Sequence, residues 1–215
     1  ACLTLGVAAS AAVGSGREAI NAGLEREGAT ILGGDAQIEL TYRFAEEAEL
    51  AWIAENAEAV TEIVDFRSMA VFGTGDAPER ALTQVKAVDD LYPLYGSVVL
   101  EPEMSLADAL DGSEGRPGAV MDPILADRLG MALGDTFRLG ATEFVLSARL
   151  VQEPDAATGG FGLGPRSIVR TDALADSGLI TQGTLLENEY KMRLSEGADL
   201  EDLSISSEAD FSGGR

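Results

Sequence analysis

Apolar and polar residues alternate with a period of two early in the chain. Ala36, Ile38 and Leu40 are separated by polar residues, and the run follows the pair Gly33–Gly34. A period of two is typical of a half-buried strand, and paired glycines commonly end a preceding helix. The pattern therefore predicts a strand through Ala36, Ile38 and Leu40.

The next segment has a helical period instead. Residues 44–60 place apolar side chains at spacings of three and four, which predicts an amphipathic helix. Its buried face is expected to carry Leu50, Ile53, Ala57 and Val60. Trp52 lies off this stripe, and we expect it to pack in the core, as we do for Met69 and Phe72.

Two further apolar runs, residues 61–73 and 80–89, flank the turn-forming segment "TGDAPE". They predict two consecutive strands joined by a tight connection. A strand, a helix and two strands in this order are typical of an α/β or α+β fold.

Shorter elements follow beyond residue 100. A helix is expected at residues 105–110, another is expected to begin at Asp122–Pro123, and a third covers 172–178 with Asp172 as its N-cap. Strands are expected near 118–121, 136–139, 141–155, 166–171 and 188–194, with a turn at Gly134–Asp135, a glycine-rich loop at 156–165 and a helix at 199–210.

One connection has an unusual composition. The segment "KAVDDLYPLYGSVVL" places Tyr92, Pro93, Tyr95 and Gly96 between two strand-like runs, although the chain has only four tyrosines. Proline fixes its backbone φ angle, and tyrosine combines a large apolar ring with a polar tip. Three interpretations remain open: a ligand cradle, a surface that docks a partner, or a packed corner between two subdomains.

The charge of the chain excludes one class of partner. Its 215 residues include 37 acidic and 15 basic ones, so the formal net charge is −22. Nucleic acid requires clustered basic residues, so we expect no nucleic-acid partner. The apolar content of 46% supports a folded core, and only Lys86 and Lys191 are lysines. A saline habitat and an ordinary solvated acidic surface both account for this balance.

The residue inventory also excludes several kinds of catalytic and metal site. The chain has no histidine and one cysteine, Cys2, so it contains no Ser-His-Asp triad, no histidine-ligated zinc and no internal disulfide. It lacks a P-loop, and its paired carboxylates lie in runs typical of solvated helix faces and turns. We therefore predict no catalytic residue, no metal and no cofactor.

The opening segment is the exception to the acidic character of the chain. Residues 1–14 carry no charge, and a helical pattern continues to about residue 28. We expect residues 1–28 to be the end of a transmembrane helix and its stalk, because fourteen residues are fewer than the roughly 20 of a complete span. An ordinary N-terminal helix is one alternative, and a lipid anchor on Cys2 is another.

Six motifs follow one another in a recognisable order: "EREGATILGGDAQIEL", "FRSMAVFG", "QVKAVDDLYPLYGSVVL", "DPILADRLGMALGDTFRLG", "VQEPD" and "GPRSIV". Together they resemble the first extracytoplasmic domain of FtsX/MacB-like ABC transporter permeases of the YbbP type, over about residues 1–194. The chain departs from the family pattern by stopping soon after Phe211, where the family continues into a strand and a second membrane span.

The resemblance implies an α/β (α+β) fold with a porter-like lobe and an inserted strand-rich lobe, the MacB-like periplasmic core. The porter-like lobe would comprise residues 29–90 and 167–215, and the inserted lobe residues 91–166. The Tyr92–Gly96 segment would then lie where the chain passes between lobes, which favours a rigid inter-lobe corner over direct ligand contact.

The resemblance also implies partners and a location. The chain would belong to a permease of the cell inner membrane, face the periplasm, and work with a separate cytoplasmic ABC ATPase subunit. A hydrophobic or lipid-like cargo and a periplasmic esterase or lysophospholipase partner would fit the family. Two rival hypotheses remain: a free-standing periplasmic ligand-binding protein, and a hydrolase that uses a carboxylate pair.

Overall fold

The computed structural model describes residues 32–75, 77–155, 164–181, 183–195 and 198. The strands are β1 (Ala36–Thr41), β2 (Ala59–Phe72), β3 (Glu79–Val88), β4 (Val99–Glu101), β5 (Gly118–Met121), β6 (Thr136–Leu139), β7 (Thr142–Gln152), β8 (Arg166–Arg170) and β9 (Leu186–Arg193). The helices are α2 (Glu47–Asn56), α3 (Leu106–Asp111), α4 (Pro123–Leu129) and the short 3₁₀ helix η1 (Asp172–Leu174).

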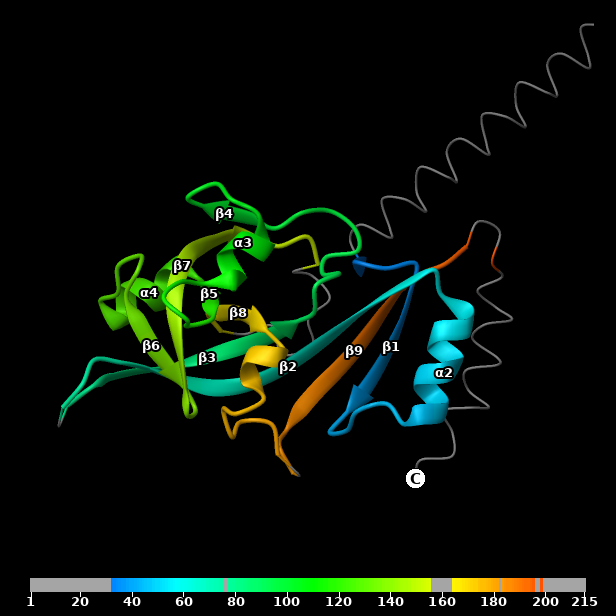
Figure 1. Ribbon diagram of the computed structural model, residues 1–215, viewed down its shortest axis with the longest axis horizontal. Coiled ribbons are helices and arrows are strands. Elements are labelled where there is room, and N and C mark those ends of the chain that lie inside the picture. The colour runs from blue at the N-terminus through cyan, green and yellow to red at the C-terminus, as the bar shows by residue number, and fades with distance from the viewer. Residues whose placement is uncertain (1–31, 76, 156–163, 182, 196–197, 199–215) are drawn as a thin grey trace, which may run out of the picture.

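In these residues, nine strands form one mixed sheet in the order β1-β9-β2-β3-β8-β5-β7-β4, and β6 pairs with both β2 and β7. Most neighbours are antiparallel, whereas β3 pairs with β8 and β5 with β7 in parallel. Figure 1 shows α2 beside β1 and β9 at one end of the molecule and β4 to β8 with α3 and α4 at the other. The expected mixed α/β class is confirmed.

Strand β2 connects the two ends of the molecule. Its first half pairs with β9 from Ala59 to Phe66, and its last three residues pair with β6 from Ala70 to Phe72. Its ten residues from Ile63 to Phe72 also pair with β3, which forms the hairpin predicted from the two apolar runs. One strand therefore contributes to the packing at both ends of the sheet (Figure 1).

The main apolar core lies under α4. It joins buried side chains of β2, β3, β6, β7 and β8, among them Phe66, Val85, Phe144 and Leu146. The helix begins as predicted, because the Asp122 side chain accepts a hydrogen bond of 2.8 Å from the backbone N–H of Ile124. Pro123 then occupies the first helical turn, where its missing N–H costs nothing.

A second apolar cluster occupies the other face of the sheet, under α3. It contains Ile63, Val88 and Ile168 from neighbouring strands, with Ala109 of α3 above them. A Cβ atom on Gly118 would lie only 1.9 Å from the Ala109 carbonyl oxygen. The helix can therefore approach β5 this closely only because residue 118 has no side chain.

The expected buried face of the helix in residues 44–60 is wrong at Leu50, whereas Ile53 is buried and both Ala57 and Val60 pack partly buried against the same apolar cluster. The helix ends at Asn56, and Val60 belongs to β2. Leu50 is 44% exposed, whereas Glu49 and Ile53 are buried. The helix is rotated because the Glu49 carboxylate turns inward and accepts hydrogen bonds of 2.6 and 2.8 Å from Arg43.

Other expectations need smaller corrections. Met69 is exposed, whereas Trp52 and Phe72 are partly buried against apolar clusters, as predicted. Residues 172–178 form only the single turn η1, whose N-cap is Thr171 and not Asp172.

The predicted stalk in residues 1–28, the helix in residues 199–210 and most of the glycine-rich loop lie outside the described residues. Within the part of the chain that the structure describes, no helix has the length and apolarity needed to cross a membrane.

Candidate functional site: the tyrosine corner and the ionic cluster beneath it

The four residues singled out in the sequence lie just after the end of β3. Tyr92 is 7% exposed and packs against the apolar cluster under α3. Its hydroxyl donates a hydrogen bond of 2.6 Å to Asp155 Oδ1 and accepts one of 2.9 Å from Lys86 Nζ. Burial raises the pKa of Tyr92 well above its ordinary value, and the negative charge of Asp155 raises it further.

Tyr95 contacts a different part of the fold. Its hydroxyl donates a hydrogen bond of 2.8 Å to Asp35 Oδ2, at the entrance to β1. The guanidinium of Arg193, at the end of β9, lies 5.4 Å from the centre of the Tyr95 ring. The same guanidinium donates a hydrogen bond of 2.9 Å to the Leu94 carbonyl oxygen. This half of the corner therefore contacts the β1–β9 end of the sheet.

The two remaining corner residues shape the backbone. Pro93 follows Tyr92 through a cis peptide bond and is partly buried. Gly96 is exposed and has a φ angle of 75°, a region that favours glycine. The structure thus brings Tyr92 and Tyr95 into contact with two separate parts of the molecule.

A set of buried charged residues lies directly beneath Tyr92. Strand register aligns Asp65 with Lys86, Gln84 with Arg166, and Thr61 with Lys191, so these side chains share one face of the sheet. Residues of the segment that follows β7 cover them. We call the set the ionic cluster; it consists of Asp65, Lys86, Glu153, Asp155, Arg166, Glu189 and Lys191.

Asp155 is the centre of the ionic cluster. Its Oδ1 accepts a hydrogen bond of 2.8 Å from Lys86 Nζ, and its Oδ2 accepts one of 2.6 Å from Lys191 Nζ. Burial opposes ionisation of Asp155, but the attraction of the two ammonium groups outweighs it and holds the pKa well below its usual range. The backbone of Gly33 closes the site, because a Cβ atom there would lie 3.1 Å from Lys191 Nζ.

The remaining members extend the ionic cluster sideways. Glu153 forms ion pairs with two cations: its Oε2 lies 3.1 Å from Lys86 Nζ, and its Oε1 lies 2.9 Å from Arg166 Nη1. Glu189 lies 3.5 Å from Lys191 Nζ, yet burial raises the pKa of Glu189 to about 7. Burial also raises the pKa of Asp65. The positive charges of Lys86 and Arg166 lower this pKa, but they offset the effect of burial only in part. The ionic cluster is therefore a buried network with carboxyl groups of two kinds.

The ionic cluster is not evident from the sequence pattern, although the sequence contains one signal of it. The chain has only two lysines, and both are almost fully buried here, with Lys86 at 2% and Lys191 at 1% exposure. Each lies in a strand among apolar neighbours, where a solvated lysine would be out of place. The rarity of lysine in this acidic chain was interpreted only as a surface property.

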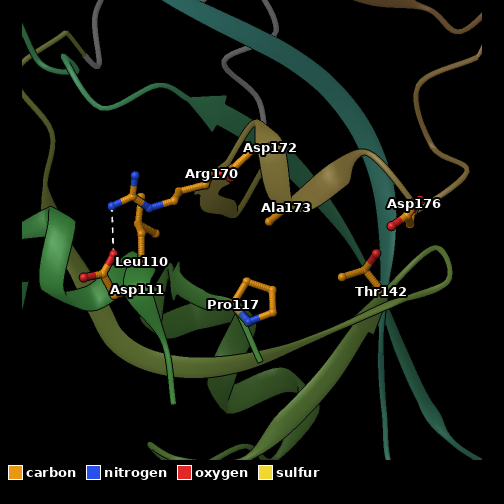
Figure 2. Close-up of a pocket in the computed structure, with 8 residues that line it drawn as sticks. All are labelled: Leu110, Asp111, Pro117, Thr142, Arg170, Asp172, Ala173 and Asp176. Carbon is orange, nitrogen blue, oxygen red and sulfur yellow. Dashed lines mark hydrogen bonds and ion pairs between the residues drawn. The ribbon is translucent and has the colours of Figure 1, made fainter. Parts of the chain in front are cut away.

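Figure 2 shows a pocket elsewhere, between the end of α3, the start of β7 and η1. Its volume is about 620 Å³. Arg170 points into it and donates a hydrogen bond of 2.9 Å to Asp111, and it also pairs with Asp90. Because Arg170 is neutralised by two aspartates while Asp172 and Asp176 add further carboxylates, the lining is acidic.

Within the described residues, no group of three or more histidine, cysteine, aspartate or glutamate side chains could hold a metal ion. The ionic cluster instead joins β2, β3, β8 and β9 to the segment that follows β7.

No protein-family model matches the chain. The chain is 28% identical over 193 residues to the uncharacterized ABC transporter permease YbbP of Escherichia coli K12. The match covers 88% of this chain but only 22% of YbbP, so the chain spans about a fifth of that protein's length. The resemblance to YbbP-type permeases that the sequence indicated is confirmed by this match.

Three solved structures match the chain with TM-scores of 0.47 to 0.48. The periplasmic region of MacB from Actinobacillus actinomycetemcomitans matches with a TM-score of 0.47 and 11% identity, over 76% of this chain and 72% of MacB's. The extracellular domain of the noncanonic ABC-type transporter YknZ from Gram-positive bacteria matches with a TM-score of 0.48 and 12% identity, over 77% of this chain and 79% of the YknZ chain. A domain of a putative permease protein from Porphyromonas gingivalis matches with a TM-score of 0.47 and 12% identity, over 74% of this chain and 71% of that domain's chain.

Proposed function

We propose that this chain is the extracytoplasmic domain of an ABC transporter permease subunit in the inner membrane, and that it faces the periplasm. The observation that supports this is the sequence match to an ABC transporter permease over 88% of the chain. A separate cytoplasmic ATPase subunit would hydrolyse ATP, and the domain would move in response. The domain itself would then be a binding and mechanical part without catalysis.

The tyrosine corner would serve as a rigid junction between two lobes. Tyr92 is held by Lys86 and Asp155 on one side, while Tyr95 is held by Asp35 and Arg193 on the other. Two aromatic side chains a few residues apart thus attach one segment to both ends of the sheet. These contacts support a rigid joint, through which movement of one lobe would be passed on to the other.

The lobes would follow the division expected from the sequence, with an inserted lobe at residues 91–166 and a porter-like lobe on either side of it. The neighbourhood of β9 with β1 and β2 supports this division, because strands from both flanking segments lie together there. A hydrophobic or lipid-like cargo for extrusion or release, and a periplasmic esterase or lysophospholipase partner, rest on the family resemblance alone.

Cysteine labelling of the complete gene product in cells tests the location. In a background in which Cys2 and every other cysteine of the complete gene product are replaced by serine, Ser97→Cys places a single thiol at an exposed position beside the corner. A membrane-impermeant maleimide should label it in cells whose outer membrane alone is permeabilised. Ala109→Cys, at a position with 0% exposure, is the matched control and should react only after denaturation.

Labelling of Ser97→Cys only after the inner membrane is lysed would refute the periplasmic location. Co-purification of the complete permease with a cytoplasmic ABC ATPase subunit tests the partner. A complete gene product with no membrane helix would instead favour a free-standing periplasmic ligand-binding protein.

The corner has its own test. Replacing Tyr92 and Tyr95 together by alanine should lower the melting temperature of the purified chain markedly, since truncating a buried aromatic costs about 3–5 kcal/mol. An unchanged melting temperature together with lost binding of cargo would show that the tyrosines contact a ligand.

A further inference from the structure

Two aspartates in the ionic cluster are equally buried but differ in their partners. Asp65 is 1% exposed and Asp155 is 2% exposed. Asp155 accepts hydrogen bonds from two ammonium groups and one hydroxyl. Asp65 has a buried oxygen, Oδ1, with no hydrogen-bond partner among the described residues. A buried anion requires compensation, and Asp65 receives less of it from hydrogen bonds than Asp155 does.

The neighbour of Asp65 across the sheet makes ionisation less favourable still. Strand register places Glu187 of β9 directly opposite Asp65 of β2. Side chains directly opposite one another have Cβ atoms about 4.5–5.5 Å apart, and like charges in this arrangement repel. Glu187 also has a buried oxygen, Oε2, without a partner among the described residues. Two adjacent carboxyl groups therefore each lack a hydrogen-bond partner for one oxygen.

The charges around Asp65 do not balance. The ionic cluster holds three cations and four carboxyl groups, and Glu187 beside it brings the carboxyl groups to five, two more than the cations. The groups that face Asp65 come from β3, β8, β9 and the segment after β7; they are Lys86, Arg166, Glu187, Glu189, Glu153 and Asp155.

We propose that Asp65 binds a proton at neutral pH and is the neutral acid of the ionic cluster. The proton on Oδ1 makes this atom a donor, and Oε2 of Glu187 across the strand is the available acceptor. One proton shared between the two unpartnered oxygens removes one of the two excess negative charges. The upward shift of the Asp65 pKa through burial agrees with this assignment.

The proposal fixes the sign of a pH effect. A carboxyl group whose pKa is higher in the folded than in the unfolded chain binds more protons when folded. Its contribution to stability is therefore complete below the unfolded value, about 4, and is lost as the pH rises through the folded pKa. Asp155 behaves in the opposite way, because its contribution is present at neutral pH and is lost only in acid.

Asp65→Asn and Asp155→Asn form a matched pair of variants, since asparagine resembles the protonated side chain in shape. At pH 7 we expect Asp65→Asn to melt within about 2 °C of the unsubstituted chain or above it, with less loss of stability at alkaline pH. Asp155→Asn should melt about 10 °C lower, because it breaks buried ion pairs. Thermal melts of the purified 215-residue chain between pH 5 and 9 measure both effects.

Carboxyl ¹³C NMR of the unsubstituted chain, with Asp65 assigned through its backbone resonances, reads the charge state directly and does not depend on whether a variant folds. A protonated Asp65 signal at pH 7 supports the proposal. An ionised signal at pH 7 overturns it, including the case in which an alkali-metal ion lies between Asp65 and Glu187. Destabilisation of Asp65→Asn as large as that of Asp155→Asn would also overturn it.

Discussion

The two faces of the central sheet are equally dry but are built from different chemistry. Under α4, the core consists of apolar side chains such as Phe66, Phe144 and Leu146. On the other face, Lys86, Asp155 and the rest of the ionic cluster lie beside Tyr92, next to the apolar cluster under α3. The first face depends on the area removed from water, whereas the second depends on the direction and charge of each contact.

This difference determines how each face responds to substitution. An apolar core tolerates changes that preserve volume, and truncation costs energy according to the cavity that remains. A buried ion pair contributes little when compared with an apolar replacement of both partners, but removal of one partner leaves an uncompensated charge. The ionic cluster should therefore specify how the covering segments attach, while the apolar core provides most of the stability.

The largest effect is expected for Lys86→Met. It removes the cation that contacts Tyr92, Glu153 and Asp155, and should lower the free energy of unfolding by about 3–5 kcal/mol. Denaturant melts at pH 7 measure the change. Arg138→Met, an exposed position on β6, is the control and should change stability by no more than about 0.5 kcal/mol. Equal effects at both positions would remove the distinction between buried and exposed charge.

Leu146→Ala should destabilise the apolar face by about 3 kcal/mol, since Leu146 on β7 is 0% exposed and its truncation leaves a cavity. The loss should be the same at pH 5 and pH 8, because the packing around Leu146 in the core cluster is apolar. Denaturant melts at the two pH values measure this. A loss that varied strongly with pH would mean that the two faces are not independent.

Tyr92→Phe should cost about 1–3 kcal/mol, because it leaves Lys86 and Asp155 without the hydroxyl that lies between them. The ring is retained, so the effect isolates the polar contact from the aromatic packing. The same denaturant melts measure the loss. A neutral result would show that the hydroxyl is not required by the ionic cluster.

The smallest effect is expected for Tyr95→Phe, at about 0.5 kcal/mol. Tyr95 is only partly buried, and water can replace its hydroxyl at Asp35. Comparison of Tyr92→Phe with Tyr95→Phe tests the two halves of the corner against each other. A larger loss of stability for Tyr95→Phe than for Tyr92→Phe would contradict the expectation that the Tyr92 hydroxyl is held more strongly.

The apolar face was largely predictable from the sequence. The strand at residues 136–139 and the helix start at Asp122–Pro123 were placed correctly, because alternation and capping are local signals. Local signals failed at Leu50, where the Arg43–Glu49 contact rotates the helix. The ionic cluster was missed for a related reason: Lys86 and Lys191 meet Asp155 only after distant strands pair.

The shared strand β2 has a mechanical consequence. Its 14 residues extend roughly 46 Å at about 3.3 Å per residue, with hydrogen-bonded neighbours along nearly all of that length. A force directed along β2 would act in shear on all of these hydrogen bonds together. The two ends of the sheet would therefore resist tension as a single cooperative unit.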